Sequence, residues 1–281
     1  MSEFRIKPFL KWAGGKRWLT SAGVLPAAGR YERYIEPFLG SAAVYFHLLP
    51  KAAILSDLND DLIHLFRTIR SDPATFRAAM EEHQRQHCSQ HYYAVRSSDP
   101  VDPISRAARF LYLNRTCWNG LYRVNLKGEF NVPIGTKDSV LFPDDNFHAV
   151  AAALAGAELI SSDFERVIDR SKQGDLVFVD PPYTVRHNFN GFLKYNESIF
   201  SWADQVRLAE CVTAAVARGA AVIVTNANHE SVQELYKDAF MYREIKRASV
   251  LAANSAKRGP TTEAIFSANI QTPTPPRLPH G

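Results

Sequence analysis

The most constraining feature of the sequence is a short apolar run, residues 176–179, that ends in Asp180-Pro181-Pro182-Tyr183. An apolar run of this length between turn residues is typical of a buried strand. Neither proline can donate to a strand ladder, so the strand must end there. The sequence therefore predicts an acid, two carbonyl groups and an aromatic ring at the carboxyl end of a strand, where open α/β sheets bind ligands.

These four residues suit one chemical task. The Asp180 carboxylate and the Pro181 carbonyl can both accept hydrogen bonds from a planar amino group, and the Tyr183 ring can stack on the heterocycle that carries it. Such an amino nitrogen is a weak nucleophile because its lone pair is delocalised, and two acceptors would orient it for attack. The alternative is a plain strand-to-turn junction with a surface acid, since Asp-Pro and Pro-Pro are common turn signals.

Composition sets the broad class of protein. The 281 residues fit one large domain or two small ones, and 46% hydrophobic residues suffice for a core. The net charge of +4 is compatible with nucleic acid without establishing it. Three widely spaced cysteines indicate a reducing cytoplasm. We expect neither a signal peptide nor a membrane helix, because no basic start precedes an apolar stretch and no apolar run approaches about 18 residues.

The first 57 residues have the pattern of a nucleotide-binding unit. A strand at 33–38, a glycine turn at 39–42 and an apolar helix at 43–49 follow one another, and a second strand at 52–57 ends in Asp57, about 20 residues after the turn, where an acid holds ribose hydroxyls. Ala42 stands where a second glycine would be usual. Gly14-Gly15-Lys16 lets a backbone approach a ligand, but Arg17 replaces the Ser or Thr of a phosphate loop.

Residues 60–115 are predicted to be helical, with Pro73 and Pro103 early in new helices. His83, His87, Cys88 and His91 share one helix face and raise the question of a metal site. We favour a solvated face instead, because the surrounding stretch is polar all round and no second ligand cluster appears.

The segment 114–135 combines turn signals with aromatic and basic side chains. Trp118, Tyr122 and Phe130 interleave with Arg115, Arg123 and Lys127, and Lys127-Gly128 predicts a hairpin turn. This decoration suits base stacking and contacts to guanine edges or phosphates. A hairpin that buries its aromatic residues in a core is the equally weighted alternative.

Helices and strands alternate again from residue 149. We predict a helix at 149–154, strands at 158–164 and 221–226, a helix at 201–218 that begins with a capping box, and an antiparallel pair near 243–250 and 262–269. A polar and aromatic loop at 188–200 could order over a substrate. The proline-rich tail 271–281 is predicted to be disordered.

Five blocks together resemble the Dam-type DNA adenine-N6 methyltransferases. They are residues 11–16, 36–40, 56–59, 118–133 and 180–183, and they cover the chain from about 9 to 270. The resemblance implies an α/β fold, a doubly wound, mostly parallel Rossmann-like sheet with an antiparallel final strand. It implies a discontinuous catalytic domain at 1–60 and 146–270, a helical target-recognition domain with a β-hairpin at 61–145, and the tail 271–281.

The resemblance also implies S-adenosylmethionine as the methyl donor, no metal, and double-stranded DNA as the partner. Asp180, Pro181, Pro182 and Tyr183 would be catalytic. The residues expected to bind the donor are Trp12, Ala13, Gly14, Gly15, Lys16, Glu36, Phe38, Gly40, Ser41, Asp57, Asp163, Phe164 and Asp180. The residues expected to contact DNA are Lys11, Trp118, Asn119, Leu121, Arg123, Asn125 and Pro133.

By this resemblance the chain would methylate the amino group of a flipped-out adenine in a short duplex site, with GATC or a related sequence as the hypothesis. The alternatives are cytosine-N4 methylation, whose motif more often begins with Ser, and an inactive DNA-binding regulator on the same fold. A cytosine carbon-5 enzyme is disfavoured because none of the cysteines follows a proline. We expect a cytoplasmic, nucleoid-associated monomer or weak dimer, with a restriction endonuclease sharing the site as a candidate partner.

Overall fold

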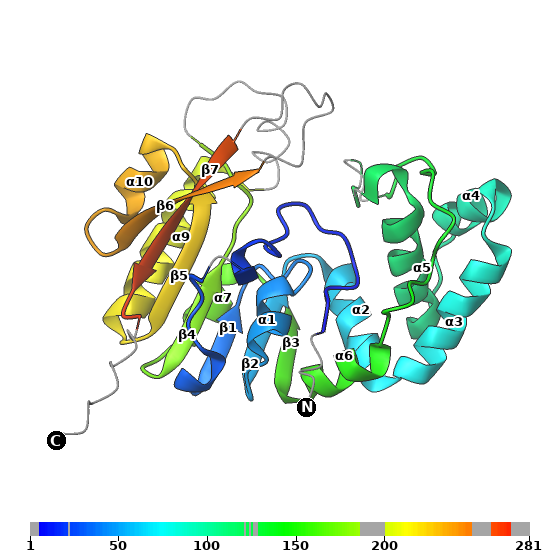
Figure 1. Cartoon of the computed structure of the whole chain (residues 1–281), viewed down its shortest axis with the longest axis horizontal. Helices are drawn as coiled ribbons and strands as arrows, with labels where there is room; N and C mark the ends of the chain where they lie inside the picture. The colour runs from blue at the N-terminus through cyan, green and yellow to red at the C-terminus, as the bar shows by residue number, and fades with distance from the viewer. Residues whose placement is uncertain are drawn as a thin grey trace, which may run out of the picture. The chain divides into compact units, whose positions relative to one another are not determined.

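The structure is a computed structural model that describes residues 6–21, 23–120, 122–123, 125, 129–185, 200–248 and 260–270. The described strands form one sheet in the order β3-β2-β1-β4-β5-β7-β6 (Figure 1). They are β1 (Arg33–Glu36), β2 (Ala53–Asp57), β3 (Ala157–Ser161), β4 (Asp175–Val179), β5 (Ala221–Ala227), β6 (Met241–Ala248) and β7 (Pro260–Ala268).

The sheet is parallel except at one edge. β1 pairs with β4, β2 with β3, and β4 with β5 in parallel, whereas β7 is antiparallel to both β5 and β6. The predicted α/β class with a mostly parallel, doubly wound sheet is confirmed, as is the antiparallel pair near the end of the chain. The apolar runs become strands because both faces are covered: every residue of β4 is buried.

The α-helices are α1 (Ala43–Leu48), α2 (Asp60–Ser71), α3 (Pro73–Gln86), α4 (Ser89–Ser97), α5 (Pro103–Thr116), α6 (Phe147–Ala153), α7 (Phe164–Ile168), α9 (Trp202–Ala217) and α10 (Glu230–Tyr236). Short 3-10 turns occur at η1 (Leu19–Ser21), η2 (Ala28–Arg30), η3 (Trp118–Gly120) and η4 (Leu154–Gly156). Within the described part of the chain, no helix is long and apolar enough to cross a membrane.

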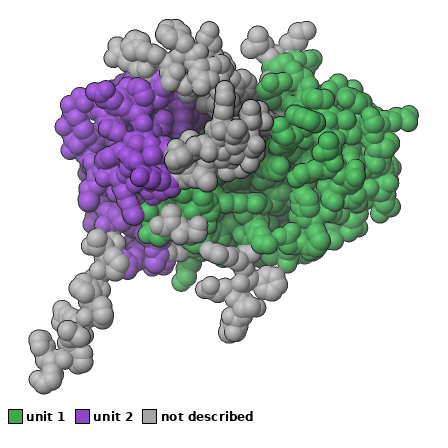
Figure 2. All heavy atoms as spheres, turned by 45° about the horizontal axis from the view of Figure 1, so that its top comes forward, with its two compact units in different colours: residues 1–25, 36–164 green, residues 26–35, 165–281 purple. Residues whose placement is uncertain are grey.

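Contacts divide the chain into two compact units (Figure 2). Unit 1 comprises residues 1–25 and 36–164, and it contains β2, β3 and the helices α1 to α6. Unit 2 comprises residues 26–35 and 165–281, and it contains β4 to β7 with α9 and α10. The catalytic domain and the target-recognition domain predicted from the sequence have different bounds from these two units, and they stay a prediction.

The helix boundaries follow the capping signals. The Asn59 side chain accepts a 3.0 Å hydrogen bond from the Leu62 amide at the start of α2, and Pro73 and Pro103 occupy the first turns of α3 and α5. Ser201 and Asp204 form the predicted capping box of α9. Helix α10 was not predicted from the sequence, and the predicted strand 158–164 is too long, because Phe164 instead begins α7.

The histidine cluster of unit 1 is a packed contact between helices. His83 Nδ1 lies 3.0 Å from His91 Nε2, and the His83 ring stacks on Tyr112 with the centroids 4.6 Å apart. His87 Nδ1 lies 2.8 Å from the Tyr112 hydroxyl. No group of three His, Cys, Asp or Glu residues in the described ranges could hold a metal ion. Burial, followed by the charge of the neighbouring His91, lowers the pKa of His83 to about 4.

This lowered pKa predicts a loss of stability in mild acid. Between about pH 6.5 and 4 an unfolded histidine binds a proton that the folded His83 does not, so the free energy of unfolding falls as the pH falls. Because the ring is only half-buried, we expect His83→Phe to remove about 1 kcal/mol of the change between pH 7 and 5, well below the full linkage. Urea unfolding at both pH values measures it.

The matched control is His148→Asn, since His148 is exposed on α6. It should keep the wild-type pH dependence of unfolding. Identical pH dependence in His83→Phe and the wild type would contradict the prediction.

Candidate active site

Asp180 stands at the end of β4 in unit 2, and its carboxylate is oriented by a neighbouring strand. The hydroxyl of Thr225, on β5, donates a 2.7 Å hydrogen bond to Asp180 Oδ1. Thr225 is itself fully buried, and its rotation is restricted by its β-branched side chain. The carboxylate plane is therefore set by a rigid strand.

Tyr183 is held at the tip of its ring. Its hydroxyl donates a 2.8 Å hydrogen bond to Glu263 Oε2 on β7. Burial raises the pKa of Tyr183 well above its usual value, and the negative charges of Asp180 and Glu263 add to the shift. The side chain is therefore a neutral phenol at neutral pH, and it donates a hydrogen bond to Glu263.

The proline loop between Asp180 and Tyr183 is also anchored. The Gln205 side chain, on α9, donates to the Pro182 carbonyl at 3.2 Å, and Asn226 donates to Gln205 Oε1 at 2.9 Å. Gln205 and Asn226 are both fully buried. The loop is thus held by a hydrogen-bonded chain that runs from α9 to β5.

Sequence reasoning missed these supporting residues, namely Thr225, Gln205, Asn226 and Glu263. Their signal was present as polar residues at core positions. Thr225 and Asn226 end an apolar strand, and Gln205 lies one turn before the buried Leu208 on α9. A buried polar side chain needs a partner, so each of these positions marks a hydrogen bond.

In unit 1 the turn after β1 is held by Asp57. The Gly40 amide donates to Asp57 Oδ2 at 3.0 Å, and the Asn59 amide donates to Asp57 Oδ1 at 3.0 Å. Burial raises the pKa of Asp57, whereas these backbone N–H groups lower it. The two backbone amides thus hold the Asp57 carboxylate in one orientation. It lies at the carboxyl end of β2, the edge at which open α/β sheets bind ligands.

Gly40 allows a close contact with Trp12. Its φ is +48°, and an added Cβ would lie 2.7 Å from Cδ1 of the Trp12 indole. A side chain at residue 40 would therefore displace the ring as well as strain the backbone. Gly14, with φ of +76°, provides a left-handed turn in the loop that carries Trp12.

Ala42 shows why glycine would be usual at its position. Its φ of 55° and ψ of 29° place it in the left-handed region, which costs an L-residue about 1–2 kcal/mol. The side chain is fully buried. The departure noted in the sequence is thus a backbone strain that the surrounding turn accommodates.

Buried charge and apolar rings complete the predicted donor site in unit 1. Lys16 is 4% exposed, and its ammonium group donates to the Gly14 carbonyl at 2.9 Å. Phe38 and Phe164 stack with their ring centroids 5.5 Å apart. Glu36 and Ser41 are buried, Asp163 is half-buried, and Ala13 and Gly15 are exposed.

The residues predicted to contact DNA come together around η3. The Lys11 amide donates to Asn114 Oδ1 at 3.0 Å, and the Lys11 side chain lies against Gly120, where an added Cβ would be 2.4 Å from its Cδ. Burial, followed by the charge of Lys137, lowers the pKa of Lys11. Trp118 donates its amide to the Pro133 carbonyl at 2.9 Å and remains 52% exposed.

Three further predicted DNA residues lie in η3 or after it. Asn119 and Arg123 are exposed, and Asn125 forms reciprocal hydrogen bonds with Glu129. Leu121 lies outside the described residues, as do Lys127 and Gly128, on which the hairpin turn was predicted.

Part of the interpretation of this segment was wrong. Arg115 is 4% exposed and pairs with Asp145 at 2.6 Å, so it cannot reach nucleic acid. Tyr122 and Phe130 pack in an aromatic cluster with Phe110, with the Phe110 and Tyr122 centroids 4.2 Å apart and those of Tyr122 and Phe130 4.9 Å apart. For these side chains the alternative of a segment that packs its aromatic residues together is the better description, because burial of apolar rings is more favourable than their exposure to water.

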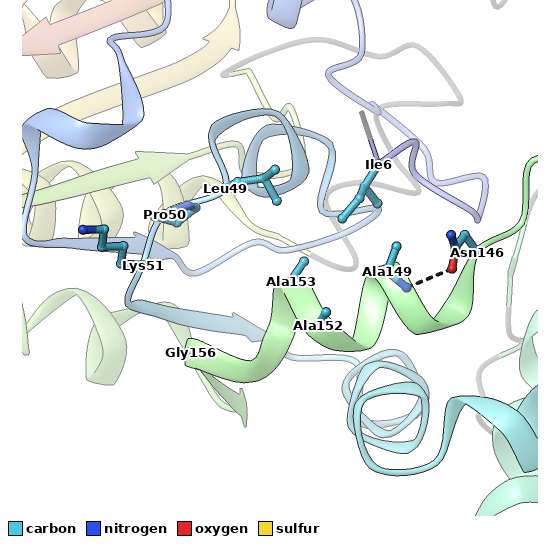
Figure 3. Close-up of a pocket in the computed structure, with 9 residues that line it drawn as sticks. All are labelled: Ile6, Leu49, Pro50, Lys51, Asn146, Ala149, Ala152, Ala153 and Gly156. Atoms are coloured by element: carbon cyan, nitrogen blue, oxygen red, sulfur yellow. Dashed lines mark hydrogen bonds between the residues drawn. The ribbon is translucent and has the colours of Figure 1, made fainter. Parts of the chain in front are cut away.

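A surface depression of unit 1 lies apart from these residues (Figure 3). Leu49, Pro50 and Lys51 line it before β2 begins, and Gly156 lines it before β3 begins. It therefore lies at the amino-terminal ends of β2 and β3, whereas Asp57 ends β2 and Asp163 follows the carboxyl end of β3. No residue predicted to be functional lines it.

Comparison with known proteins identifies what these features resemble. The family model described as D12 class N6 adenine-specific DNA methyltransferase matches residues 12–250. The chain is 34% identical to the Type II methyltransferase M1.LlaDCHI of Lactococcus lactis subsp. cremoris, covering 95% of this chain and 96% of that protein. It is 34% identical to the Type II methyltransferase M.MjaIII of Methanocaldococcus jannaschii, covering 90% and 95%. It is 30% identical to the DNA adenine methylase of Escherichia coli K12, covering 95% and 98%.

Proposed function

Because the chain belongs to the D12 class N6 adenine-specific DNA methyltransferase family, we propose that it moves a methyl group from S-adenosylmethionine to a flipped-out adenine of duplex DNA. The observation that carries this proposal is the end of β4. There Asp180 is oriented by Thr225 at 2.7 Å, and the Tyr183 ring is anchored by Glu263 at 2.8 Å. An acceptor group and a stacking surface on one short loop suit an amino group attached to a heterocycle.

The proposed donor fits the chemistry of unit 1. S-adenosylmethionine supplies an electrophilic methyl group and carries a carboxylate, ribose hydroxyls and an adenine. The Lys16 ammonium suits the carboxylate, the Asp57 carboxylate suits the ribose hydroxyls, and the Phe38 and Phe164 rings with Asp163 suit the adenine. Gly40 gives Trp12 room to pack against the turn, a cradle that a Cβ would fill.

The remaining proposed donor residues have supporting roles. Ala13, Gly14 and Gly15 form the loop that carries Trp12 and Lys16, and Gly15 donates its amide to the Trp12 carbonyl at 3.2 Å. Glu36 and Ser41 flank the turn held by Asp57.

For the acceptor, the adenine must leave the base stack, because its amino group cannot otherwise reach a reactive centre. In our proposal Tyr183 stacks on the extruded base, while the Asp180 carboxylate and the Pro181 carbonyl accept hydrogen bonds from its amino group. Pro182 keeps the loop rigid, and its carbonyl is already bound by Gln205. Catalysis is then mainly orientation and electrostatic stabilisation by groups fixed before the substrate arrives.

Target choice is proposed to reside around η3. Arg123 would contact a guanine edge, Leu121 a thymine methyl group, and Lys11 the first base of the site. Exposed Trp118 with Asn119 would occupy the gap left by the extruded base, supported by Pro133 and Asn125. The proposed target is GATC or a related short sequence. Since two relatives are Type II methyltransferases by name, a restriction endonuclease that shares the site is a candidate partner.

Removal of the Asp180 carboxylate tests the proposed acceptor site. Asp180→Ala should lower kcat for methyl transfer to duplex DNA by about 10²-fold or more, the usual effect of losing a preorganised hydrogen-bonding group. Labelled methyl transfer with nucleoside analysis measures it, and N6-methyladenine is the expected product. The exposed Asp238→Ala is the control and should keep wild-type kcat. Undiminished turnover by Asp180→Ala would refute the assignment.

Crowding of Trp12 tests the proposed donor site. Gly40→Ala places a Cβ 2.7 Å from the indole, so we expect binding of S-adenosylmethionine to weaken by about 10-fold or more, measured by calorimetric titration. Gly23→Ala is the matched control, because its φ of +64° imposes the same backbone strain with no atom within 4 Å. Equal donor affinity in the two variants would contradict the placement.

Truncation of Arg123 tests target reading. Arg123→Ala should reduce discrimination between the target site and single-base variants by about 10-fold or more, since a bidentate arginine–guanine contact contributes about 1–3 kcal/mol. Site mapping on a duplex library measures the preference. Arg85→Ala removes an exposed positive charge from α3 and controls for the loss of general attraction to DNA. Unchanged site preference in Arg123→Ala would show that another residue reads the target.

A further inference from the structure

We propose that Glu263 is a positioning residue that holds the Tyr183 ring in the orientation needed to stack on the target adenine. Glu263 lies 80 residues from Tyr183 in the chain and outside the five blocks that carry the family resemblance. The inference rests on the proposed function, because it concerns the same acceptor site.

Residue 263 is an energetically unfavourable place for a carboxylate. Glu263 is 3% exposed on β7, which runs between β5 and β6 in the sheet, and it is in register with Ala227 and Ile245. Glutamate is almost never fully buried unless it is paired, since burial of a carboxylate is costly without hydrogen bonds. Its flanks on β7 include the fully buried Ala264 and the buried Ile265. A carboxylate at such a core position indicates a specific partner.

The partner of Glu263 is the hydroxyl group of Tyr183. Tyr183 Oη lies 2.8 Å from Glu263 Oε2. The Tyr183 hydroxyl oxygen lies on the axis about which the ring rotates, so its position fixes the direction of that axis. Because a phenolic O–H lies in the plane of the ring, its hydrogen bond to Glu263 in turn favours the ring plane that contains the acceptor. The near end is already held, because Gln205 binds the carbonyl of the preceding residue, Pro182, at 3.2 Å. The ring is thereby anchored at both ends before any base arrives.

The hydrogen bond between Tyr183 and Glu263 has only one possible direction. A carboxylate can only accept, so the Tyr183 hydroxyl must donate. A serine at residue 263, or a water molecule in place of the carboxylate, could either donate to or accept from the Tyr183 hydroxyl, and would therefore permit several ring orientations. Burial also raises the pKa of Tyr183, so the donor keeps its proton well above neutral pH. The bond therefore has one direction, with Tyr183 as the donor and Glu263 as the acceptor.

The arrangement matches that of Asp180. Thr225 on β5 orients the Asp180 carboxylate, and Glu263 on the adjacent β7 orients the Tyr183 ring. The two antiparallel strands thus supply one fixed hydrogen bond to each functional side chain of the loop. A residue of this kind acts on the base only through Tyr183, and it should leave donor binding untouched.

A double-mutant cycle tests the proposal on the full chain. Tyr183→Phe keeps the ring and removes the hydroxyl, whereas Glu263→Ala removes the acceptor. We expect each variant to lower kcat/KM for duplex DNA by about 10-fold, and the double variant to lose about 10-fold rather than about 100-fold, because both changes break the same bond. Affinity for S-adenosylmethionine should stay at the wild-type value throughout.

A conservative variant and a neighbouring control sharpen the result. Glu263→Gln keeps an acceptor oxygen at the same place and should restore kcat/KM to within about 3-fold of wild type. Glu244→Ala removes a carboxylate from the adjacent strand β6, where Glu244 accepts from Asn228 at 3.1 Å, and should have no effect. Fluorescence of 2-aminopurine at the target position reports stacking directly, and its signal should change in Glu263→Ala and recover in Glu263→Gln.

Several outcomes would overturn the assignment. Additive losses in the cycle, or unchanged kcat and KM in a Glu263→Ala protein of reduced stability, would show a structural role alone. If Glu263→Ala does not fold, wild-type kcat/KM in Tyr183→Phe overturns it equally. If the wild-type protein methylates DNA but the losses in the double-mutant cycle are additive, only the role of Glu263 is refuted. A wild-type protein that binds the donor and methylates no DNA refutes the proposed function and this inference together.

Discussion

The structure depends on the abrupt end of β4. Because Pro181 and Pro182 cannot extend the ladder, the chain leaves the sheet at Asp180 and requires other partners for its polar groups. Those partners are buried side chains on the neighbouring elements: Thr225 on β5, Gln205 on α9 and Glu263 on β7. Each is polar in an apolar surrounding and stable only with its bond made. Stability and orientation of the loop therefore have the same physical origin.

Much of the fold was predictable because its signals are local. The apolar runs at β2, β4 and β5, the capping residues Asn59 and Ser201, and the prolines that begin α3 and α5 all act within a few residues of their own position. The candidate site residues came from the resemblance of five motifs to a known family, and their roles stay predictions. What sequence could not supply was the pairing of residues distant in the chain. Tyr183 and Glu263 are 80 residues apart, and only the sheet order brings them together.

The segment after α5 shows a second limit. Tyr122 and Phe130 have the composition of a nucleic-acid surface, yet they pack in an aromatic cluster with Phe110, and Arg115 at the end of α5 is buried. Trp118 and Arg123, in contrast, are exposed. A loop pattern has no fixed period, so composition alone cannot separate its inner from its outer side chains, in contrast to a strand or a helix. The left-handed backbone of Ala42 was hidden for a related reason, since an alanine gives no sign of a positive φ.

The buried Arg115 also explains how the first residues of the chain are held. Its guanidinium donates to the Phe9 carbonyl at 2.6 Å and pairs with Asp145, while the neighbouring Asn114 exchanges two hydrogen bonds with the backbone of Lys11. Trp12 then stacks near Phe110 and Tyr122, with both centroid distances at 6.3 Å. The loop proposed to bind the donor is thus built on the end of α5, from which the proposed recognition segment starts. Trp12 and Asn114 therefore tie this loop to the end of α5, Trp12 through stacked rings and Asn114 through paired hydrogen bonds.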